Sequence, residues 1–353
     1  MNSKNNKLVG IVGTHGLPAN YSGWETLVKN LVLQRKNIDY LIATPSYRKI
    51  DQTDEYQKMS VYIGLKASGW QSIFYDLIST IVLLKKCDTI LILGVSGCVF
   101  LPIIKLFTKK DITVNTDGVE HKREKWGFLA SKFLKISEMF AVRYATRLVA
   151  DNKGINDYIE TEYNRKVNST IAYGGVSFIP AKPTHLKKYN FIDKGYDMAI
   201  ARIVPENNIE TILNTYNELN QPLIFIGNWD SSDYSINLKN KKWNTNIHIM
   251  DADYDENRIT SLRNSCRYYI HGHSAGGTNP SLVEALSIGC NILCYDVNFN
   301  RYVLEDNAAY WSSKNELSSL ISFELDFDKE KMQNYYQNNF DWKIITNKYE
   351  SIL

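Results

Sequence analysis

Short apolar runs alternate with helix-forming segments along most of this 353-residue chain, and the alternation limits the fold more than any other feature. Alternating strands and helices are typical of a parallel sheet that helices cover on both faces. The first half gives predicted strands at residues 8–12, 40–43, 61–63, 90–93, 112–115 and 148–150, with helices such as 25–33 and 73–84 between them. The pattern then restarts, with predicted strands at residues 198–201, 223–226, 247–250, 268–270 and 292–295. We therefore predict an α/β protein with two doubly wound, Rossmann-like domains.

The segment between the two halves has the composition of a hinge. It contains Gly174, Gly175, Pro180 and Pro183. We place the domain boundary between residues 176 and 180. This gives an N-terminal domain of residues 1–177 and a C-terminal domain of residues 178–334. The final segment, residues 335–353, is rich in Tyr, Phe and Trp, and we expect it to form helices that pack back on the first domain.

The composition excludes several classes of protein. Hydrophobic residues make up 44% and charged residues 22%, which is ordinary for a globular protein with a large core. The net charge of +3 is too small for a general nucleic-acid binder, and no zinc finger, basic zipper or aromatic RNA-binding signature is present. The five cysteines, an odd number without metal-binding spacing, indicate reduced thiols in a cytosolic protein. The polar start of the chain predicts no signal peptide.

Two further segments bear on membrane contact. Residues 89–107 are apolar, but Gly94, Pro102 and Lys105 interrupt them, so we predict a strand, a loop and a short helix rather than a membrane span. Residues 105–153 hold eleven Lys and Arg against six Asp and Glu, a local balance of +5. This basic segment favours contact with an anionic membrane surface or an acidic substrate. An ordinary solvated face is the alternative interpretation.

A glycine-rich loop leads from a predicted strand into a helix between residues 269 and 289. Asn279 has the chemistry of an N-cap, Pro280 that of a first helical residue, and Gly289 that of a helix stop. The N-terminus of a helix after such a loop presents backbone N–H groups and a positive dipole end, which suits a phosphate. Glu284, one turn into the helix, could hold two ribose hydroxyls. The segment therefore predicts a nucleotide site.

Other loops that follow predicted strands also carry candidate residues. Arg202 follows the first strand of the second half, where its guanidinium could hold a diphosphate through two hydrogen bonds. Asp117 follows a strand of the first half and could orient an acceptor hydroxyl, or it could simply form an Asp-Gly turn. Glu25, three residues after Ser22, fits either a capping box or a ligand contact. These loops would meet the ligand at the carboxyl edge of each sheet.

Two patterns could suggest a metal, and we favour a different interpretation of each. His271 and His273 share one face of a strand but have no third ligand at a usual spacing, so we expect His273 to form hydrogen bonds near the phosphate loop. Asp251, Asp253 and Asp255 lack the glycine of a calcium loop, so we expect this acidic segment to open a helix.

Taken together, the motifs resemble the retaining GT-B glycosyltransferases of family four, and within them the bacterial rhamnosyltransferase-like group of surface-polysaccharide biosynthesis. The matching blocks are GTHGLPANYSGWE at 13–25, DGVE at 117–120 with KW at 125–126, ADNKG at 150–154, IAYGG at 171–175, RIVPENN at 202–208 and HGHSAGGTNPSLVE at 271–284. They span nearly the whole chain in order, and together they are more specific than any one block. The resemblance implies a GT-B fold, in which two Rossmann-like domains face an interdomain cleft.

The resemblance also implies roles for individual residues. Gly16 would approach the donor phosphates, Arg202 would hold the diphosphate and Glu284 would bind the ribose. The glycine-rich loop would complete the donor site with His273, Gly276, Gly277, Thr278 and Asn279. Asp117 is our acceptor-side catalytic candidate, beside Arg202 on the donor side.

Two positions depart from the family pattern. Gly276 stands where the wider family usually has a Glu that contacts the donor sugar. Asn207 stands where a Lys is common, so the grip on the diphosphate would depend more on Arg202 and the helix amides. These departures leave the identity of the donor open.

The resemblance thus implies a metal-independent hexosyltransferase without a cofactor, which uses a UDP- or dTDP-linked sugar, rhamnose among them. The acceptor would be a lipid-linked sugar or an oligosaccharide. We expect a cytoplasmic protein that contacts the inner face of the cell membrane peripherally through residues 105–153. The alternatives are a nucleotide-sugar epimerase of the same fold, a metal-dependent transferase that uses Asp251 and Asp253, and a nucleotide-sugar-binding protein without catalysis.

Overall fold

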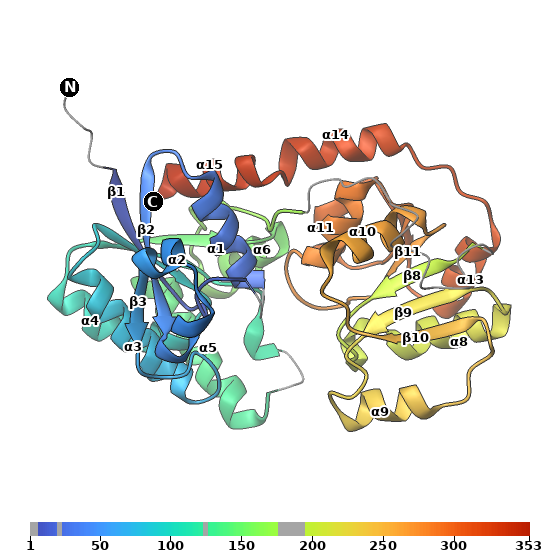
Figure 1. The fold of residues 1–353 in the computed structure, drawn as a ribbon, viewed down its shortest axis with the longest axis horizontal. Helices are drawn as coiled ribbons and strands as arrows, with labels where there is room; N and C mark the ends of the chain where they lie inside the picture. The colour runs from blue at the N-terminus through green and yellow to red at the C-terminus, as the bar shows by residue number, and fades with distance from the viewer. Residues whose placement is uncertain (1–5, 20–22, 123–125, 176–194) are drawn as a thin grey trace. The chain divides into compact units, whose positions relative to one another are not determined.

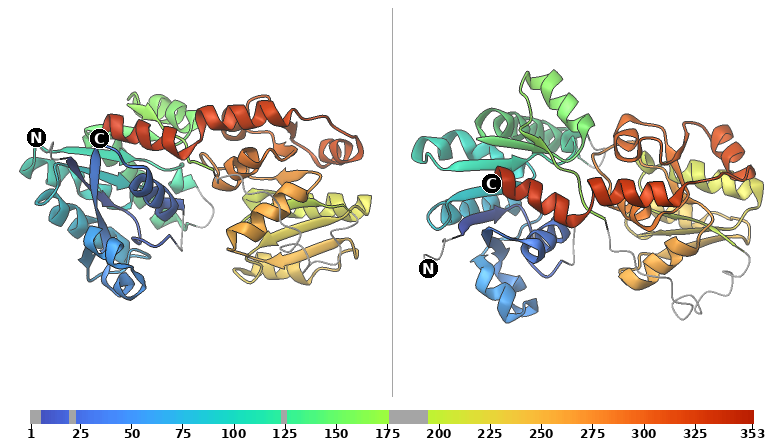
Figure 2. Two further views of the ribbon diagram at one scale, coloured as in Figure 1. Left: turned by 45° about the horizontal axis from the view of Figure 1, so that its top comes forward. Right: turned by 90° about the horizontal axis from the view of Figure 1, so that it is seen from above.

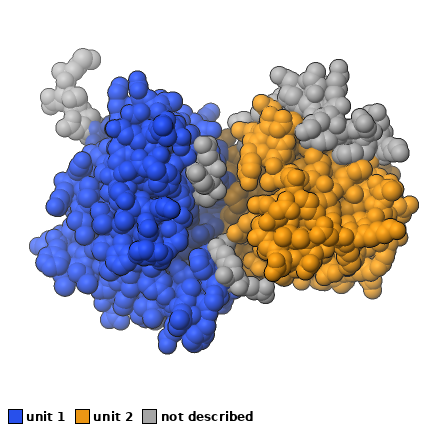
Figure 3. All heavy atoms as spheres, turned by 60° about the horizontal axis from the view of Figure 1, so that its bottom comes forward, with its two compact units in different colours: residues 1–173, 342–353 blue, residues 174–341 orange. Residues whose placement is uncertain are grey.

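A computed structural model describes residues 6–19, 23–122, 126–175 and 195–353 of the chain. The chain divides into two compact units (Figure 3). Unit 1 comprises residues 1–173 and 342–353, and unit 2 comprises residues 174–341. The boundary predicted between residues 176 and 180 lies outside the described residues, as do Ser22 of the capping box and Lys125 of the KW pair at residues 125–126.

Unit 1 is built on a seven-stranded parallel sheet with the strand order β3-β2-β1-β4-β5-β6-β7 (Figure 1). In chain order its elements are β1 (Lys7–Val12), α1 (Gly23–Gln34), β2 (Ile38–Pro45), η1 (Ser46–Asp51), α2 (Asp54–Met59), β3 (Ser60–Ile63), α3 (Gln71–Leu84), β4 (Thr89–Leu93), η2 (Ser96–Phe100), α4 (Leu101–Phe107), β5 (Asp111–Asn115), η3 (Glu120–Lys122), α5 (Phe128–Tyr144), β6 (Arg147–Ala150), α6 (Lys153–Tyr163), β7 (Ser169–Thr170) and α15 (Trp342–Ile352). The strand, loop and short helix predicted for residues 89–107 are confirmed as β4, η2 and α4.

Helices cover both faces of this sheet. Successive side chains of β1 point to opposite faces, and each face is packed against helices. Val9 and Ile11 pack with α1 and with Ile345 and Tyr349 of α15, which lies beside α1 (Figure 2). Gly10 faces the other side, where a Cβ atom would lie only 2.9 Å from the Cβ of Leu83 in α3. The glycine therefore lets α3 approach the sheet closely.

Unit 2 contains a six-stranded parallel sheet with the order β10-β9-β8-β11-β12-β13. Its elements are β8 (Asp197–Ile200), η5 (Pro205–Asn207), α8 (Ile209–Leu219), β9 (Leu223–Gly227), α9 (Asp233–Asn240), β10 (Ile247–Asp251), α10 (Glu256–Ser265), β11 (Tyr269–His271), α11 (Pro280–Ile288), β12 (Ile292–Tyr295), α12 (Asn298–Leu304), β13 (Ala309–Trp311), α13 (Lys314–Ser322) and α14 (Lys329–Asn339). Two α/β units with parallel sheets confirm the predicted fold class.

The core of unit 2 also forms on both sheet faces. Ala199, Phe225 and Ile270 pack against the side that carries α8, while Met198 and Ile224 pack against Leu262 of α10. Aromatic side chains enlarge this core, since Trp229 and Trp311 are fully buried. Residues 335–341 belong to this unit, so of the predicted C-terminal segment the structure assigns only residues 342–353 to unit 1.

Among the described helices, none is both long enough and apolar enough to cross a bilayer.

Candidate functional site

The loop between β11 and α11 carries the local features predicted for a phosphate site. Asn279 caps α11, because its side-chain Oδ1 accepts a 2.9 Å hydrogen bond from the backbone N–H of Ser281. Pro280 is the first helical residue, and Gly289 ends the helix in the left-handed conformation at φ 76°. The predicted cap, first turn and stop are therefore confirmed, and the helix places its positive dipole end at this loop.

Hydrogen bonds hold this loop against the loop that follows the neighbouring strand β8. Ser274 donates to the backbone oxygen of Glu206 from both its N–H, at 3.0 Å, and its hydroxyl, at 2.7 Å. The Asn208 side chain donates to the oxygen of Gly272 at 2.8 Å. A Cβ atom on Gly272 would lie 2.3 Å from the oxygen of Asn207, so this contact requires glycine. The structure thus brings the two predicted donor-binding loops together.

Arg202 is exposed in the loop after β8, and no other described residue pairs with its guanidinium. Hydrogen bonds to its backbone fix the position of Arg202 instead. The backbone oxygen of Arg202 accepts one from the Asn207 side chain at 2.8 Å and one from the N–H of Val204 at 3.0 Å. Asn207, at a position where the family that the motifs resemble often has a Lys, is 2% exposed. Its role here is therefore to shape the loop, which leaves Arg202 as the cation that the loop presents.

Glu284 is half-buried on α11 and forms an ion pair that the sequence analysis did not anticipate. Its Oε2 lies 2.7 Å from Nη2 of Arg263, whose side chain is 4% exposed. The same Nη2 donates to the hydroxyl of Ser281 at 2.9 Å, and that hydroxyl lies 2.6 Å from the hydroxyl of Tyr269. Arg263 therefore fixes one carboxylate oxygen of Glu284, the residue predicted to bind ribose.

A sequence signal for Arg263 did exist. Ile259 and Leu262 are buried on α10, and position 263 follows Ile259 by four residues, which places it on the same helix face. An arginine on an apolar helix face needs an anionic partner, because a buried charge without one is costly.

The two histidines predicted to share a strand face lie side by side, although β11 ends at His271 and His273 belongs to the loop after it. Their rings stack with centroids 4.4 Å apart and planes 16° apart. Burial, aided by the positive fields of His273 and Arg263, holds the pKa of His271 well below its usual range, so this ring is neutral. None of the described residues hydrogen-bonds to either ring nitrogen of His271.

The acidic segment after β10 serves the start of a helix, as expected. Asp255 caps α10 by accepting a 3.0 Å hydrogen bond from the N–H of Arg258. Asp253 holds the guanidinium of Arg258 through two hydrogen bonds of 2.6 and 2.7 Å. Among the described residues, no three His, Cys, Asp or Glu side chains are grouped as metal ligands.

Gly276 has a backbone reason to be glycine. Its φ of 123° is a conformation that residues with side chains rarely adopt, although a Cβ atom there would meet nothing within 4 Å. A Glu at this position, which is usual in the family that the motifs resemble, would therefore strain this loop. Gly277, Thr278 and Asn279 complete the turn into α11, and Thr278 is buried.

In unit 1, Gly16 and Glu25 both have local structural roles. Gly16 is buried at φ 77°, and a Cβ atom on it would lie 2.5 Å from the hydroxyl oxygen of Thr44. Glu25 is fully buried. Its Oε1 accepts hydrogen bonds from the Thr14 hydroxyl at 3.3 Å and the His15 N–H at 3.1 Å, and it lies 3.2 Å from Nδ1 of His15. Glu25 thus fastens the loop after β1, a role that neither prediction for it included.

Asp117 follows β5 and adopts the left-handed conformation, at φ 61°. Its N–H donates to the side-chain oxygen of Asn115 at 3.0 Å. Asn115 in turn donates to the hydroxyl of Tyr349 in α15 at 2.7 Å. Asp117 therefore lies in the loop at the carboxyl edge of the unit 1 sheet, where the chain bends at Gly118, and its catalytic role stays a prediction.

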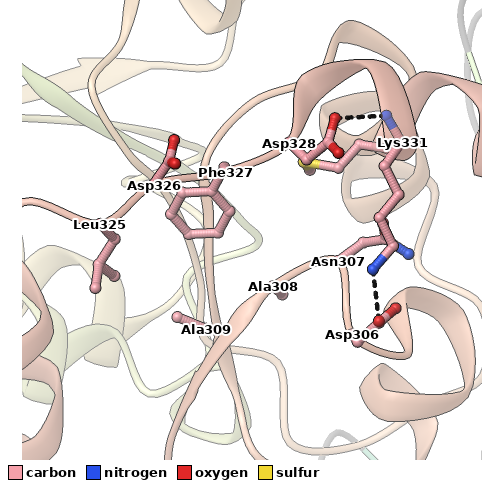
Figure 4. A pocket seen from close by; sticks show the side chains of 10 residues that line it. Asp306, Asn307, Ala308, Ala309, Leu325, Asp326, Phe327, Asp328 and Lys331 are labelled. Atoms are coloured by element: carbon pink, nitrogen blue, oxygen red, sulfur yellow. Dashed lines mark hydrogen bonds and ion pairs between the residues drawn. The ribbon is translucent and has the colours of Figure 1, made fainter.

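A cavity of about 330 Å³ lies elsewhere in unit 2 (Figure 4). It is lined by Asp306, Asn307, Ala308, Ala309, Leu325, Asp326, Phe327, Asp328, Lys331 and Met332. Residues 306–308 precede β13, so the cavity lies at the amino end of that strand, whereas the loop before α11 follows the carboxyl end of β11. In a parallel sheet these are opposite edges, and the cavity is therefore separate from the candidate site.

Comparisons with known proteins match part of the chain by sequence and nearly all of it by structure. Residues 6–176 match a family model described as a domain of unknown function (DUF1972). No curated protein matches the chain. Among solved structures, a sucrose-phosphate synthase from Thermosynechococcus elongatus is 12% identical, with 98% of each chain covered and a TM-score of 0.78.

Two further solved structures cover the chain equally well. The Anabaena protein HepE in complex with UDP is 12% identical over 98% of this chain and 99% of its own, with a TM-score of 0.74. A glycosyltransferase from Rickettsia africae is 13% identical over 99% of this chain and 98% of its own, with a TM-score of 0.69. At such low identity the likeness establishes the fold, which is that of GT-B glycosyltransferases.

Proposed function

We propose that this chain is a glycosyltransferase that moves a hexosyl group from a nucleotide diphosphate sugar to a hydroxyl of a lipid-linked or oligosaccharide acceptor. One observation carries the proposal: the exposed Arg202 lies in a loop that is bonded to the loop opening α11, where Glu284 is held by Arg263. A cation, a helix N-terminus and an oriented carboxylate suit a diphosphate and its ribose. That HepE was solved with UDP and with UDP-glucose supports this choice of ligand.

In this proposal the donor binds mainly to unit 2. Arg202 and the amides of Gly276, Gly277 and Thr278 hold the two phosphates, while Asn279 keeps the first turn of α11 in place. Glu284 accepts hydrogen bonds from the ribose hydroxyls. His273 shapes the loop beside the phosphates.

Unit 1 would supply the acceptor side. Asp117 orients the acceptor hydroxyl, and Gly16 lets the loop after β1 approach the donor phosphates. Both residues follow strands of the unit 1 sheet, the position at which parallel sheets bind ligands.

The chemistry we propose is stabilisation of the leaving group without a metal. When the sugar–oxygen bond breaks, negative charge develops on the diphosphate. Arg202, the amides and the dipole of α11 are already oriented toward the diphosphate, so they stabilise that charge without having to reorganise. We further propose retention of anomeric configuration, a UDP or dTDP donor with rhamnose among the sugars, and a place in bacterial surface-polysaccharide synthesis, all on the strength of the motif resemblance.

Transfer from labelled UDP- and dTDP-sugars to a lipid-linked acceptor fraction tests the proposal. We expect transfer with at least one donor, and we expect Arg202→Ala and Glu284→Ala to reduce the rate by about a hundredfold while the fold is kept. The matched controls are Arg35→Ala and Glu218→Ala, exposed residues away from the site, which should retain full activity.

The other outcomes identify the alternatives. A new epimer formed from donor alone would indicate an epimerase, and loss of transfer with a chelator would indicate a metal-dependent enzyme. Donor binding with no turnover of any tested sugar would indicate a binding protein.

A further inference from the structure

Exposed apolar side chains gather on neighbouring helices of unit 1. On α3, Phe74, Ile78 and Ile81 are all exposed. Their spacings of four and three residues place them on one side of the helix. Such a contiguous apolar surface is uncommon on a monomeric protein unless it meets a partner.

The short helix α4 continues this surface. Ile103, Leu106 and Phe107 are exposed, the last two by 79% and 84%. The ring of Phe74 lies 6.3 Å from that of Phe100, which directly precedes α4, so the two helices form one surface. We call the side chains of Phe74, Ile78, Ile81, Ile103, Leu106 and Phe107 the apolar face.

The helix α5 packs against α4 and extends the same layer (Figure 1). Ile136 and Met139 are partly exposed on it. The apolar part of the surface thus begins on α3, before the basic segment at residues 105–153 that the sequence analysis singled out.

The charges on these helices have one sign. The carboxylates of α3 and α5, Asp76 and Glu138, are buried at 4% and 3% exposure, and α4 contains none. Lys105, Lys132, Lys135 and Arg143 lie on α4 and α5, and Lys85, Lys86 and Lys109 follow α3 and α4 directly. The outward side of α3, α4 and α5 is therefore apolar and cationic. The exposed carboxylates nearby lie outside these three helices: Asp88 follows Lys86, and Glu162 of α6 lies 2.7 Å from Lys135.

We propose that the apolar face docks on a lipid bilayer with anionic headgroups. Apolar side chains that reach into the interface, with lysines and arginines at headgroup level, are the features that hold peripheral proteins on such a surface. A second copy of the chain is a poorer occupant, because pairing this surface with itself would bring its cations together. The inference does not depend on the proposed transfer reaction, although a bilayer would supply a lipid-linked acceptor.

Co-sedimentation of the full chain with vesicles tests the inference without any sugar donor. We expect strong binding to vesicles of phosphatidylcholine mixed with phosphatidylglycerol and weak binding to phosphatidylcholine alone. The pair Leu106→Ser and Phe107→Ser should lower partitioning by about tenfold or more, because two apolar side chains no longer enter the bilayer. Lys109→Glu should lower it by at least about fivefold, and more at low salt than at high salt.

Matched controls distinguish the face from general surface properties. Ile50, 89% exposed in η1, is as accessible as Phe107, and Lys29 is an exposed lysine on α1. Ile50→Ser and Lys29→Glu should bind vesicles within about twofold of the unchanged protein. Circular dichroism confirms that each variant is folded.

Three results would overturn the inference. The first is vesicle binding that does not depend on phosphatidylglycerol. The second is an equal loss of vesicle binding in the control variants and in the variants of the apolar face. The third is self-association of the chain that the double substitution Leu106→Ser and Phe107→Ser abolishes. None of them bears on the donor site, so the proposed function would have to be judged by its own assay.

Discussion

At the scale of single residues, the buried guanidinium of Arg263 links stability to the candidate site. Arg263→Met removes the partner of Glu284 and a hydrogen bond to Ser281. We expect a loss of roughly 3 kcal/mol in the free energy of unfolding, as when one partner of a buried pair is removed. We also expect about tenfold weaker nucleotide binding, because Glu284 is no longer held. Urea unfolding and calorimetric titration with UDP measure the two effects.

Arg267 provides the matched control for this substitution. It pairs with the buried Asp197 through hydrogen bonds of 2.6 and 2.9 Å, at the start of β8 rather than at its carboxyl end. Arg267→Met should therefore destabilise the protein without weakening nucleotide binding. Equal losses of affinity in both variants would mean that Arg263 acts through stability alone.

Asp76 gives the fold a pH dependence that can be measured. Burial raises its pKa to about 7, against an opposing hydrogen bond from the Ser96 hydroxyl. Because the folded pKa lies above the unfolded value of 3.8, the native state binds more protons between these values, and stability falls as the pH rises through this window. Asp76→Asn removes this pH dependence. As the pH rises from about 4 to about 7.5, the free energy of unfolding of the variant should therefore increase by roughly 2–4 kcal/mol relative to that of the unchanged protein.

Urea unfolding at both pH values checks the prediction for Asp76. The exposed Asp39 is the control, since Asp39→Asn should leave the pH dependence unchanged. A constant difference between Asp76→Asn and the unchanged protein at the two pH values would show that Asp76 ionises normally.

At the scale of elements, the loop before α11 depends on a glycine conformation. Gly276→Ala forces a side chain into φ 123°, which costs about 1–3 kcal/mol although the space around it is open. Gly64 also has open space around its Cβ position but no positive φ, so Gly64→Ala should be nearly neutral. Thermal unfolding compares the two, and equal effects would place the cost somewhere other than in the backbone.

The sequence predicts most elements because buried parallel strands are continuous apolar runs. The caps of α11 could be predicted for a similar reason, since Asn279, Pro280 and Gly289 act within a few residues of their own position. The strand β7 could not, because two residues are too few to show a period, and β13 could not, because only one of its three residues is buried. The pair between Arg263 and Glu284 joins α10 to α11 and follows only from tertiary packing.

The same limit applies to residues with two roles. Glu25 had a predicted local role as a cap and a possible ligand role, but its hydrogen bonds to Thr14 and His15 depend on how the loop after β1 folds over α1. Asn207 stands at a position where the resemblance leads one to expect a Lys, but its buried side chain donates a hydrogen bond to the backbone oxygen of Arg202 and so shapes that loop. Such roles depend on backbone positions that no spacing reveals.

At the scale of the whole molecule, α15 belongs to unit 1 although unit 2 precedes it in the chain. Ile345 and Tyr349 are buried in the unit 1 core, and Trp342 contacts Tyr173 with ring centroids 5.1 Å apart. Truncation after Asp341 should therefore destabilise unit 1, because it uncovers apolar residues of α1. We expect a loss on the order of several kcal/mol in the free energy of unfolding and a melting temperature lower by more than about 10 °C.

Calorimetry follows this truncation, with Tyr349→Phe as the milder variant. That substitution removes only the hydrogen bond from Asn115 and should cost about 1 kcal/mol. A truncated chain that melts like the full chain would show that α15 adds nothing to unit 1.

The most direct test of the central claim is calorimetric titration of the full chain with UDP and dTDP, each compared with its nucleoside. If Arg202 and the start of α11 hold a diphosphate, at least one nucleoside diphosphate will bind at least about a hundredfold more tightly than its nucleoside. Arg202→Ala will remove most of that difference, while Arg143→Ala will not. Equal affinity for nucleoside and nucleoside diphosphate, or full affinity in Arg202→Ala, would contradict the claim.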